Sequence, residues 1–187
     1  MILVVIRKNQ DLEETQMQKI PSITCVSEIV LNVADLPKSR EFYMRVMGFP
    51  LHSELSMEDA AADPDGEPTI TFLTICETNT PLGLGGHPQL LALIDYRRHV
   101  HAKRRFVGRD TSQSTLNHLA FEIPPDSFDA HAKRLSDFGI DLSFSDFPAM
   151  NARAMFFKDP EGNVLELICN NSSETQENLK MPTDRVG

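Results

Sequence analysis

An internal repeat most restricts the folds that are open to this chain of 187 residues. Residues 28–49, EIVLNVADLPKSREFYMRVMGF, can be aligned with residues 118–140, HLAFEIPPDSFDAHAKRLSDFGI. Each copy starts with an alternating strand, continues through a turn with Pro and Asp, and then shows apolar residues at helical spacing. Each helical stretch has a possible cap at its start and a glycine at its end, namely Asp35 and Ser127, then Gly48 and Gly139.

Three further strand candidates follow each helical stretch. They are residues 49–54, 69–76 and 89–95 in the first copy, and residues 140–145, 152–158 and 163–169 in the second. This order predicts an α+β fold in which two βαβββ modules form a cup-shaped half-barrel. The predicted organisation is an N-terminal extension (1–23), a first module (24–96), a basic linker (97–113), a second module (114–171) and a disordered tail (172–187).

Charge, the N-terminal sequence and the cysteines indicate where the protein is located and which partners it lacks. The formal net charge of −9 and a pI near 5.1 argue against a broad nucleic-acid surface. The opening run MILVVI is too short for a signal peptide or a membrane span. Three cysteines without a C-x-x-C spacing indicate reduced, buried thiols. We therefore expect a cytoplasmic protein that binds neither nucleic acid nor a membrane.

One carboxylate stands where an apolar residue is expected. Glu166 lies at the centre of the apolar strand VLELIC, just after the turn signal DPEG. A buried glutamate without a partner is costly, so Glu166 needs one. Alternation places Glu28 and His118 on the mixed, partly polar faces of the first strand of each module, and these faces are where such a partner would lie. The alternative is an ion pair with Arg153, if its strand turns that side chain inward.

Three segments resemble the vicinal oxygen chelate superfamily, also called the glyoxalase/bleomycin resistance/dioxygenase group. They are EIVLNVADLPKSREFYMRVMGF, LNHLAFEIP and FFKDPEGNVLELI. The resemblance spans roughly residues 24–170. Metal-using members carry ligands at the start of each module's first strand and in the middle of each module's last strand.

Carried over to this chain, the resemblance implies a metal site of Glu28, His118 and Glu166. The fourth ligand position falls on Ala92, which cannot bind a metal. A bulge or a shift of one residue would bring Gln89 or Asp95 there instead.

This ligand set indicates a reaction class. Ring-cleaving dioxygenases hold Fe(II) with two histidines and one carboxylate, whereas one histidine and two carboxylates better suit other divalent ions. The resemblance thus implies a divalent metal (Mn, Ni, Zn, Mg or Fe) and glyoxalase- or epimerase-like lyase or isomerase chemistry on a small oxygenated organic molecule. Glu28 or Glu166 would be the general base.

Two alternatives remain open. One is an extradiol-type ring-cleaving dioxygenase. The other is a metal-free, resistance-type protein that sequesters a small hydrophobic compound, which Ala92 favours. The resemblance also implies a homodimer, with the cup closed either within one chain or between two. The linker segment RRHVHAKRRF is either an anion clamp or, as we favour, a solvated connector or subunit-contact arm.

Overall fold

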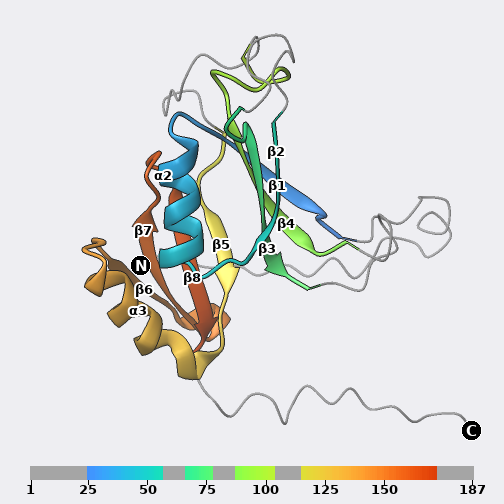
Figure 1. Ribbon diagram of the computed structural model, residues 1–187. Helices are drawn as coiled ribbons and strands as arrows, with labels where there is room; N and C mark the ends of the chain where they lie inside the picture. The colour runs from blue at the N-terminus through green and yellow to red at the C-terminus, as the bar shows by residue number, and fades with distance from the viewer. Residues whose placement is uncertain (1–24, 57–65, 78–86, 104–114, 172–187) are drawn as a thin grey trace, which may run out of the picture.

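We describe the protein from a computed structural model, in which residues 25–56, 66–77, 87–103 and 115–171 are described. The predicted N-terminal extension, the end of the basic linker and the C-terminal tail lie outside these residues. Within them, two four-stranded sheets with few helices confirm the α+β fold of two βαβββ modules (Figure 1).

The elements repeat in the same order in both modules. The first module contains β1 (Glu28–Val33), α2 (Leu36–Glu41), a π-helical turn η1 (Phe42–Val46), β2 (Leu51–Leu55), β3 (Ile70–Cys76) and β4 (Gln89–Asp95). The second contains β5 (Leu119–Glu122), the 3₁₀ turn η2 (Pro125–Ser127), α3 (Phe128–Asp137), β6 (Ser143–Phe147), the 3₁₀ turn η3 (Pro148–Met150), β7 (Ala152–Lys158) and β8 (Val164–Asn170).

The two sheets have matching topology. Their strand orders are β1-β4-β3-β2 and β5-β8-β7-β6. The first strand of each module runs parallel to the last, and the other pairs are antiparallel. Among the described residues, β1 and β5 therefore each have a strand neighbour on one side only. Such free edges invite pairing or covering by another chain.

The predicted helix boundaries are confirmed except at one cap. Asp35 caps α2 by accepting the backbone N–H of the residue three positions later at 3.0 Å. Ser127 does not cap α3, because it already has helical φ and ψ at the end of η2 and its hydroxyl donates to a carbonyl three residues earlier. Gly48 and Gly139 end the helical segments with φ of 82° and 72°, a region that glycine adopts without strain.

One hydrophobic core joins the modules. In Figure 1, α2 lies between the two sheets, and the apolar faces of both sheets pack with the helices. The buried cluster includes Val33, Tyr43, Leu73 and Leu91 of the first module and Leu135, Met155, Leu165 and Leu167 of the second. Because this core takes one face of every central strand, the mixed face of each sheet points away from it.

The turn between β7 and β8 ties the second module to the first. Asp159 accepts a hydrogen bond from the buried Tyr43 hydroxyl at 2.8 Å. Two residues later, the Glu161 carboxylate accepts the backbone N–H of Ala34, just before α2, at 2.7 Å. The DPEG turn predicted from the sequence therefore also contacts the start of α2 and the π-helical turn η1.

The Tyr43–Asp159 hydrogen bond makes stability depend on alkaline pH. Burial, followed by the Asp159 carboxylate, raises the pKa of Tyr43 well above its ordinary value of 10.0. The hydroxyl's contribution is therefore complete below about pH 10 and is lost as the pH rises further. We expect Tyr43→Phe to cost about 2 kcal/mol at neutral pH and less above pH ~10, as measured by urea unfolding. A cost that does not change with pH would contradict this.

Candidate functional site

The mixed face of the second sheet carries the candidate site. β5 and β8 pair in parallel, with Ala120 beside Glu166. His118 lies immediately before β5 and shares the face of Ala120, because side chains alternate along a strand. The pairing of these two strands brings the imidazole and the carboxylate together.

His118 and Glu166 form the predicted pair. The His118 Nε2 atom lies 3.0 Å from Glu166 Oε2, and the two side chains are 36% and 5% exposed. The alternative interpretation, an ion pair between Glu166 and Arg153, is wrong. Arg153 lies beside Cys169 on the helix side of β7. There its guanidinium stacks over the Phe128 ring at 4.1 Å. Glu166 is thus a buried carboxylate whose partner is a histidine.

The second nitrogen of His118 is also bound. Its Nδ1 lies 2.6 Å from the amide oxygen of Asn117. An amide oxygen accepts, so an Nδ1–H that donates to it leaves the lone pair of Nε2 facing the Glu166 carboxylate. A divalent cation between Nε2 and the carboxylate would make this contact favourable.

The pair has a spacing that fits a shared metal ion. Two ligand atoms with bonds of about 2.1 Å lie about 3.0 Å apart in octahedral geometry and about 3.4 Å apart in tetrahedral geometry. The 3.0 Å between Nε2 and Oε2 fits the octahedral value, and it is also the ordinary length of a direct N–H···O hydrogen bond. A ligating histidine also normally donates its other N–H to an oxygen, as His118 does to Asn117.

Glu28 does not join this pair within one chain. It is an exposed residue at the first position of β1, in the other sheet. Within residues 25–56, 66–77, 87–103 and 115–171, no group of three His, Cys, Asp or Glu side chains lies close enough to share a metal ion. The expectation that positions 28, 118 and 166 meet at one point in a single chain is therefore not met.

Strand register shows which residue occupies the fourth metal-ligand position that the resemblance implies. Val30 pairs with Ala92 in the first sheet just as Ala120 pairs with Glu166 in the second. Ala92, which is fully buried, therefore stands where the second module has Glu166. Gln89 and Asp95 differ from Ala92 by odd numbers of positions along β4, so they belong to its opposite face. Neither supplies the missing ligand.

The described part of the basic linker makes structural contacts. Arg97 forms an ion pair with the buried Asp95 at 3.6 Å and donates to the carbonyl of Ala34. Arg98 donates to the carbonyl of Glu67 at 3.0 Å. These contacts fasten the start of the linker to the first module, in agreement with the connector interpretation.

Sequence reasoning missed two neighbours of the pair. Asn117 orients the His118 ring, and the Phe156 ring stands edge-on to it with centroids 5.7 Å apart. The tripeptide Asn117-His118-Leu119 held a signal, because a histidine ligand normally needs an oxygen at its second nitrogen. Phe156 was visible only through strand pairing, which sets it beside Glu166.

Comparison with known proteins gives a family match. The family model described as "Glyoxalase/Bleomycin resistance protein/Dioxygenase superfamily" matches residues 26–167. No curated protein matches the chain. None of the helices in the described segments is long and apolar enough to cross a membrane.

Solved structures with a similar fold have different functions. Lactoylglutathione lyase from Agrobacterium tumefaciens has 18% identity and a TM-score of 0.54, and the match covers 80% of this chain and 96% of that one. A mutant of the fosfomycin resistance protein FosX from Listeria monocytogenes, complexed with Mn(II) and a dihydroxypropylphosphonic acid, has 19% identity, 86% and 100% coverage and a TM-score of 0.54. TnmS3, an antibiotic-binding protein from Streptomyces sp. CB03234, has 21% identity, 81% and 99% coverage and a TM-score of 0.51.

Proposed function

The chain belongs to the glyoxalase/bleomycin resistance protein/dioxygenase superfamily, and from this we propose that it is a divalent-metal-dependent enzyme acting on a small oxygenated organic molecule. The observation that carries the proposal is the His118–Glu166 pair, with 3.0 Å between Nε2 and Oε2. Lactoylglutathione lyase, which shares the fold, is in keeping with lyase chemistry, and the Mn(II) complex of FosX is in keeping with a divalent metal.

His118 and Glu166 are the proposed metal ligands, and a carboxylate is the proposed general base. His118 would bind through Nε2, which the hydrogen bond from Nδ1 to Asn117 leaves with its lone pair. Glu166 would bind through a carboxylate oxygen. A divalent cation held there would act as a Lewis acid on a substrate oxygen. A carboxylate of Glu28 or Glu166 would take or return the substrate proton as general base.

Glu28 would reach the site from a second copy of the chain. Its strand, β1, and the strand that follows His118, β5, each have a free edge among the described residues. Val30, next to Glu28 on the mixed face of β1, is 46% exposed, so apolar surface lies beside this edge. A two-fold dimer that pairs the first sheet of one copy with the second sheet of the other would cover both edges and add Glu28 to His118 and Glu166.

Metal content tests the proposal. Full-length protein purified without chelators is expected to contain about one divalent ion per chain by elemental analysis, and His118→Ala and Glu166→Ala variants almost none. Glu122→Gln, which removes a carboxylate from the same face further along β5, is the matched control and should keep its metal. Metal-free wild-type protein that takes up no Mn, Ni, Zn, Mg or Fe(II) on addition would overturn the enzyme assignment.

The neighbour of the ligand histidine should tune the affinity. Replacing Asn117 by Ala removes the acceptor at Nδ1 and frees the ring to rotate. We expect metal affinity to fall about ten-fold, with little change in the melting temperature because Asn117 is exposed. Calorimetric titration of the metal-free variant with Mn(II) measures this. Unchanged affinity would mean that the Asn117 contact does not orient the ligand.

A specific observation favours a second candidate, a metal-free binding protein. The fourth ligand position holds the buried methyl group of Ala92, and the strands around it are apolar. TnmS3, which shares the fold, is an antibiotic-binding protein. In this case His118 would contact Glu166 directly, and the protein would contain no metal while still binding a small hydrophobic compound.

A further inference from the structure

A crevice between the two modules adjoins the His118–Glu166 pair at Ala120, which lines it and lies beside Glu166. Its volume is about 930 Å³, within the size range of small-molecule pockets. Its walls come from the end of η1 and the chain after it, the end of β3, the start of β4, and from β5, α3 and β8. Neither His118 nor Glu166 lines it, and Glu122, which does, lies four residues along the strand from His118, or about 13 Å.

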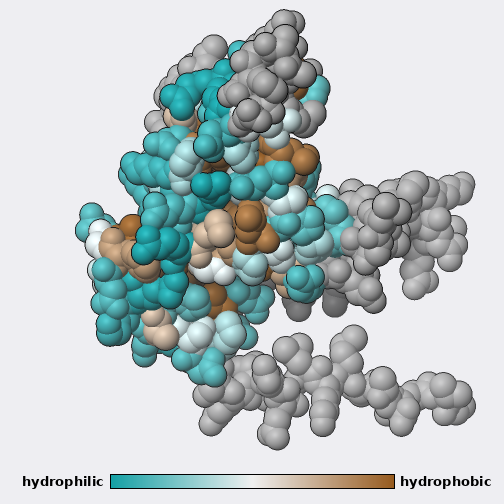
Figure 2. Space-filling view, in the orientation of Figure 1, coloured by the Kyte–Doolittle hydropathy of each residue, from teal (hydrophilic) through white to brown (hydrophobic). Residues whose placement is uncertain are grey.

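The floor of the crevice is aromatic and aliphatic. The rings of Phe49 and Phe121 meet edge-on with centroids 5.3 Å apart. Met47 and Ile75 add aliphatic surface around them. Figure 2 shows hydrophobic side chains reaching the surface between the two sheets. This floor suits the apolar body of a ligand, and aromatic rings also attract cations.

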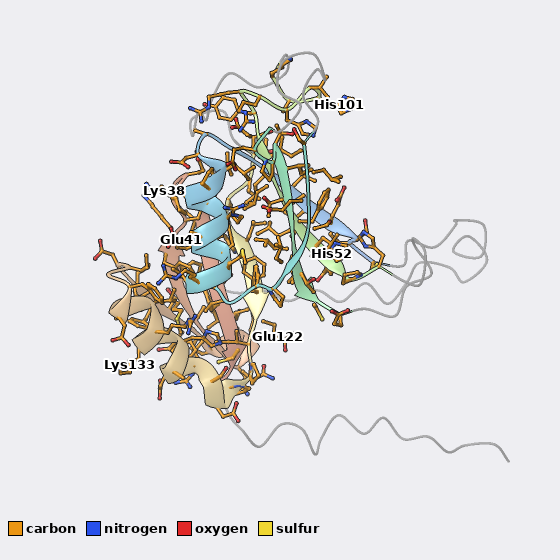
Figure 3. All side chains as sticks on the ribbon, viewed as in Figure 1. Lys38, Glu41, His52, His101, Glu122 and Lys133 are labelled. Carbon is orange, nitrogen blue, oxygen red and sulfur yellow. The ribbon has the colours of Figure 1, made fainter. Side chains whose placement is uncertain are left out.

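The polar lining is negatively charged. Glu122 and Asp126 line the crevice, and neither has a hydrogen bond or ion pair through its carboxylate to another described residue. Figure 3 shows Glu122 projecting from the end of β5 away from α3. No Lys or Arg is found among the described residues of the lining. Burial, followed by the charge of Arg134, lowers the pKa of His131, so this residue is neutral at pH 7 and leaves the carboxylates uncompensated.

We propose that this crevice binds a small molecule with an aromatic or aliphatic body and a protonated amine. The body would lie on the Phe49–Phe121 floor, and the ammonium would lie at the rim of the crevice, near the exposed carboxylates of Glu122 and Asp126. The guanidinium of Arg134 does not neutralise them, since it donates to the carbonyl of Val46 at 2.9 Å. The inference is independent of metal binding at His118 and Glu166.

Three probes of matched size separate charge from hydrophobicity. Phenylpropylamine, phenylpropanol and phenylpropionate are titrated into the ¹⁵N-labelled full-length protein at pH 7, and amide shifts are followed by NMR. We expect the amine to bind saturably, with shifts in β5 and η2. The alcohol should bind roughly five-fold more weakly and the carboxylate more weakly still. Equal binding of amine and alcohol, or shifts confined to other elements, would overturn the proposal.

Variants complete the test. Glu122→Gln/Asp126→Asn should reduce amine affinity to that of the alcohol, whereas Asp129→Asn, an equal loss of charge on a residue of α3 outside the lining, should change it little. Ile75→Trp should weaken all three probes by filling the crevice. His118→Ala should leave amine binding intact, which separates this site from the proposed metal site. If the double variant binds the amine as wild type does, the carboxylates are not the recognition element and the proposal fails.

Discussion

Glu28→Ala and His118→Ala chains that are unfolded and refolded together are expected to recover about a quarter of the wild-type metal content, although neither variant binds metal alone. In a two-fold dimer with shared sites, each site takes Glu28 from one copy and His118 with Glu166 from the other. A mixed dimer then has one intact site and one doubly defective site. Random mixing makes half of the dimers mixed, which gives the expected quarter. Elemental analysis of the repurified dimer fraction measures it.

The control refolds each variant separately and then combines the two without denaturant. This mixture should remain metal-free if the subunits do not exchange. The double variant Glu28→Ala/His118→Ala mixed with wild-type chains provides the complement, because it leaves no intact site in a mixed dimer. Full metal content in the Glu28→Ala protein alone would show that Glu28 is not a ligand. No recovery in the mixed refolding would locate the site within one chain and contradict the shared arrangement.

Of the substitutions proposed here, Asp159→Ala is expected to lower the free energy of unfolding most, by about 3–5 kcal/mol. This corresponds to a fall of roughly 10 °C in the melting temperature. This carboxylate is buried and accepts hydrogen bonds from the Tyr43 hydroxyl, from the backbone N–H groups of Glu161 and Asn163, and from the Asn163 side chain. Its removal leaves the fully buried Tyr43 hydroxyl without its acceptor and also loosens the β7–β8 turn. Thermal unfolding followed by circular dichroism measures the loss.

Asp159→Asn is the matched variant, since its amide oxygen keeps part of the accepting capacity. Its cost should lie between those of Tyr43→Phe and Asp159→Ala. In a Tyr43→Phe background, Asp159→Ala should cost less than it does alone, because the hydroxyl is already gone. Strict additivity of the two changes would show that the Tyr43–Asp159 hydrogen bond does not contribute as argued.

Much of the fold could be predicted because the same pattern occurs twice. The repeat and the turn residues located all eight strands of the described segments, and β7 matches its predicted bounds. The prediction failed most at β6, which was placed at 140–145 but spans Ser143–Phe147. Ile140 and Leu142 caused this error, because they pack against the core from a segment that is not paired as a strand. Alternating apolar residues report burial, and burial does not require strand pairing.

The candidate site was predictable only within a module. His118 and Glu166 lie on parallel neighbouring strands, so a period of two residues was enough to place them on one face. Whether Glu28 joins them depends on how two modules, and two copies, are arranged. That arrangement is set by packing between distant segments, such as the Tyr43–Asp159 contact, which leaves no periodic trace in the sequence.

The exchange of a carboxylate for a methyl group between Glu166 and Ala92 makes the two halves of the duplicated fold chemically unequal. A compound held between β4 of one half and β8 of another would contact the apolar Ala92 methyl group on one side and the Glu166 carboxylate on the other. Such a gradient of polarity would align the compound head to tail. The backbone of the two halves is similar, but the bound compound would have a single preferred orientation.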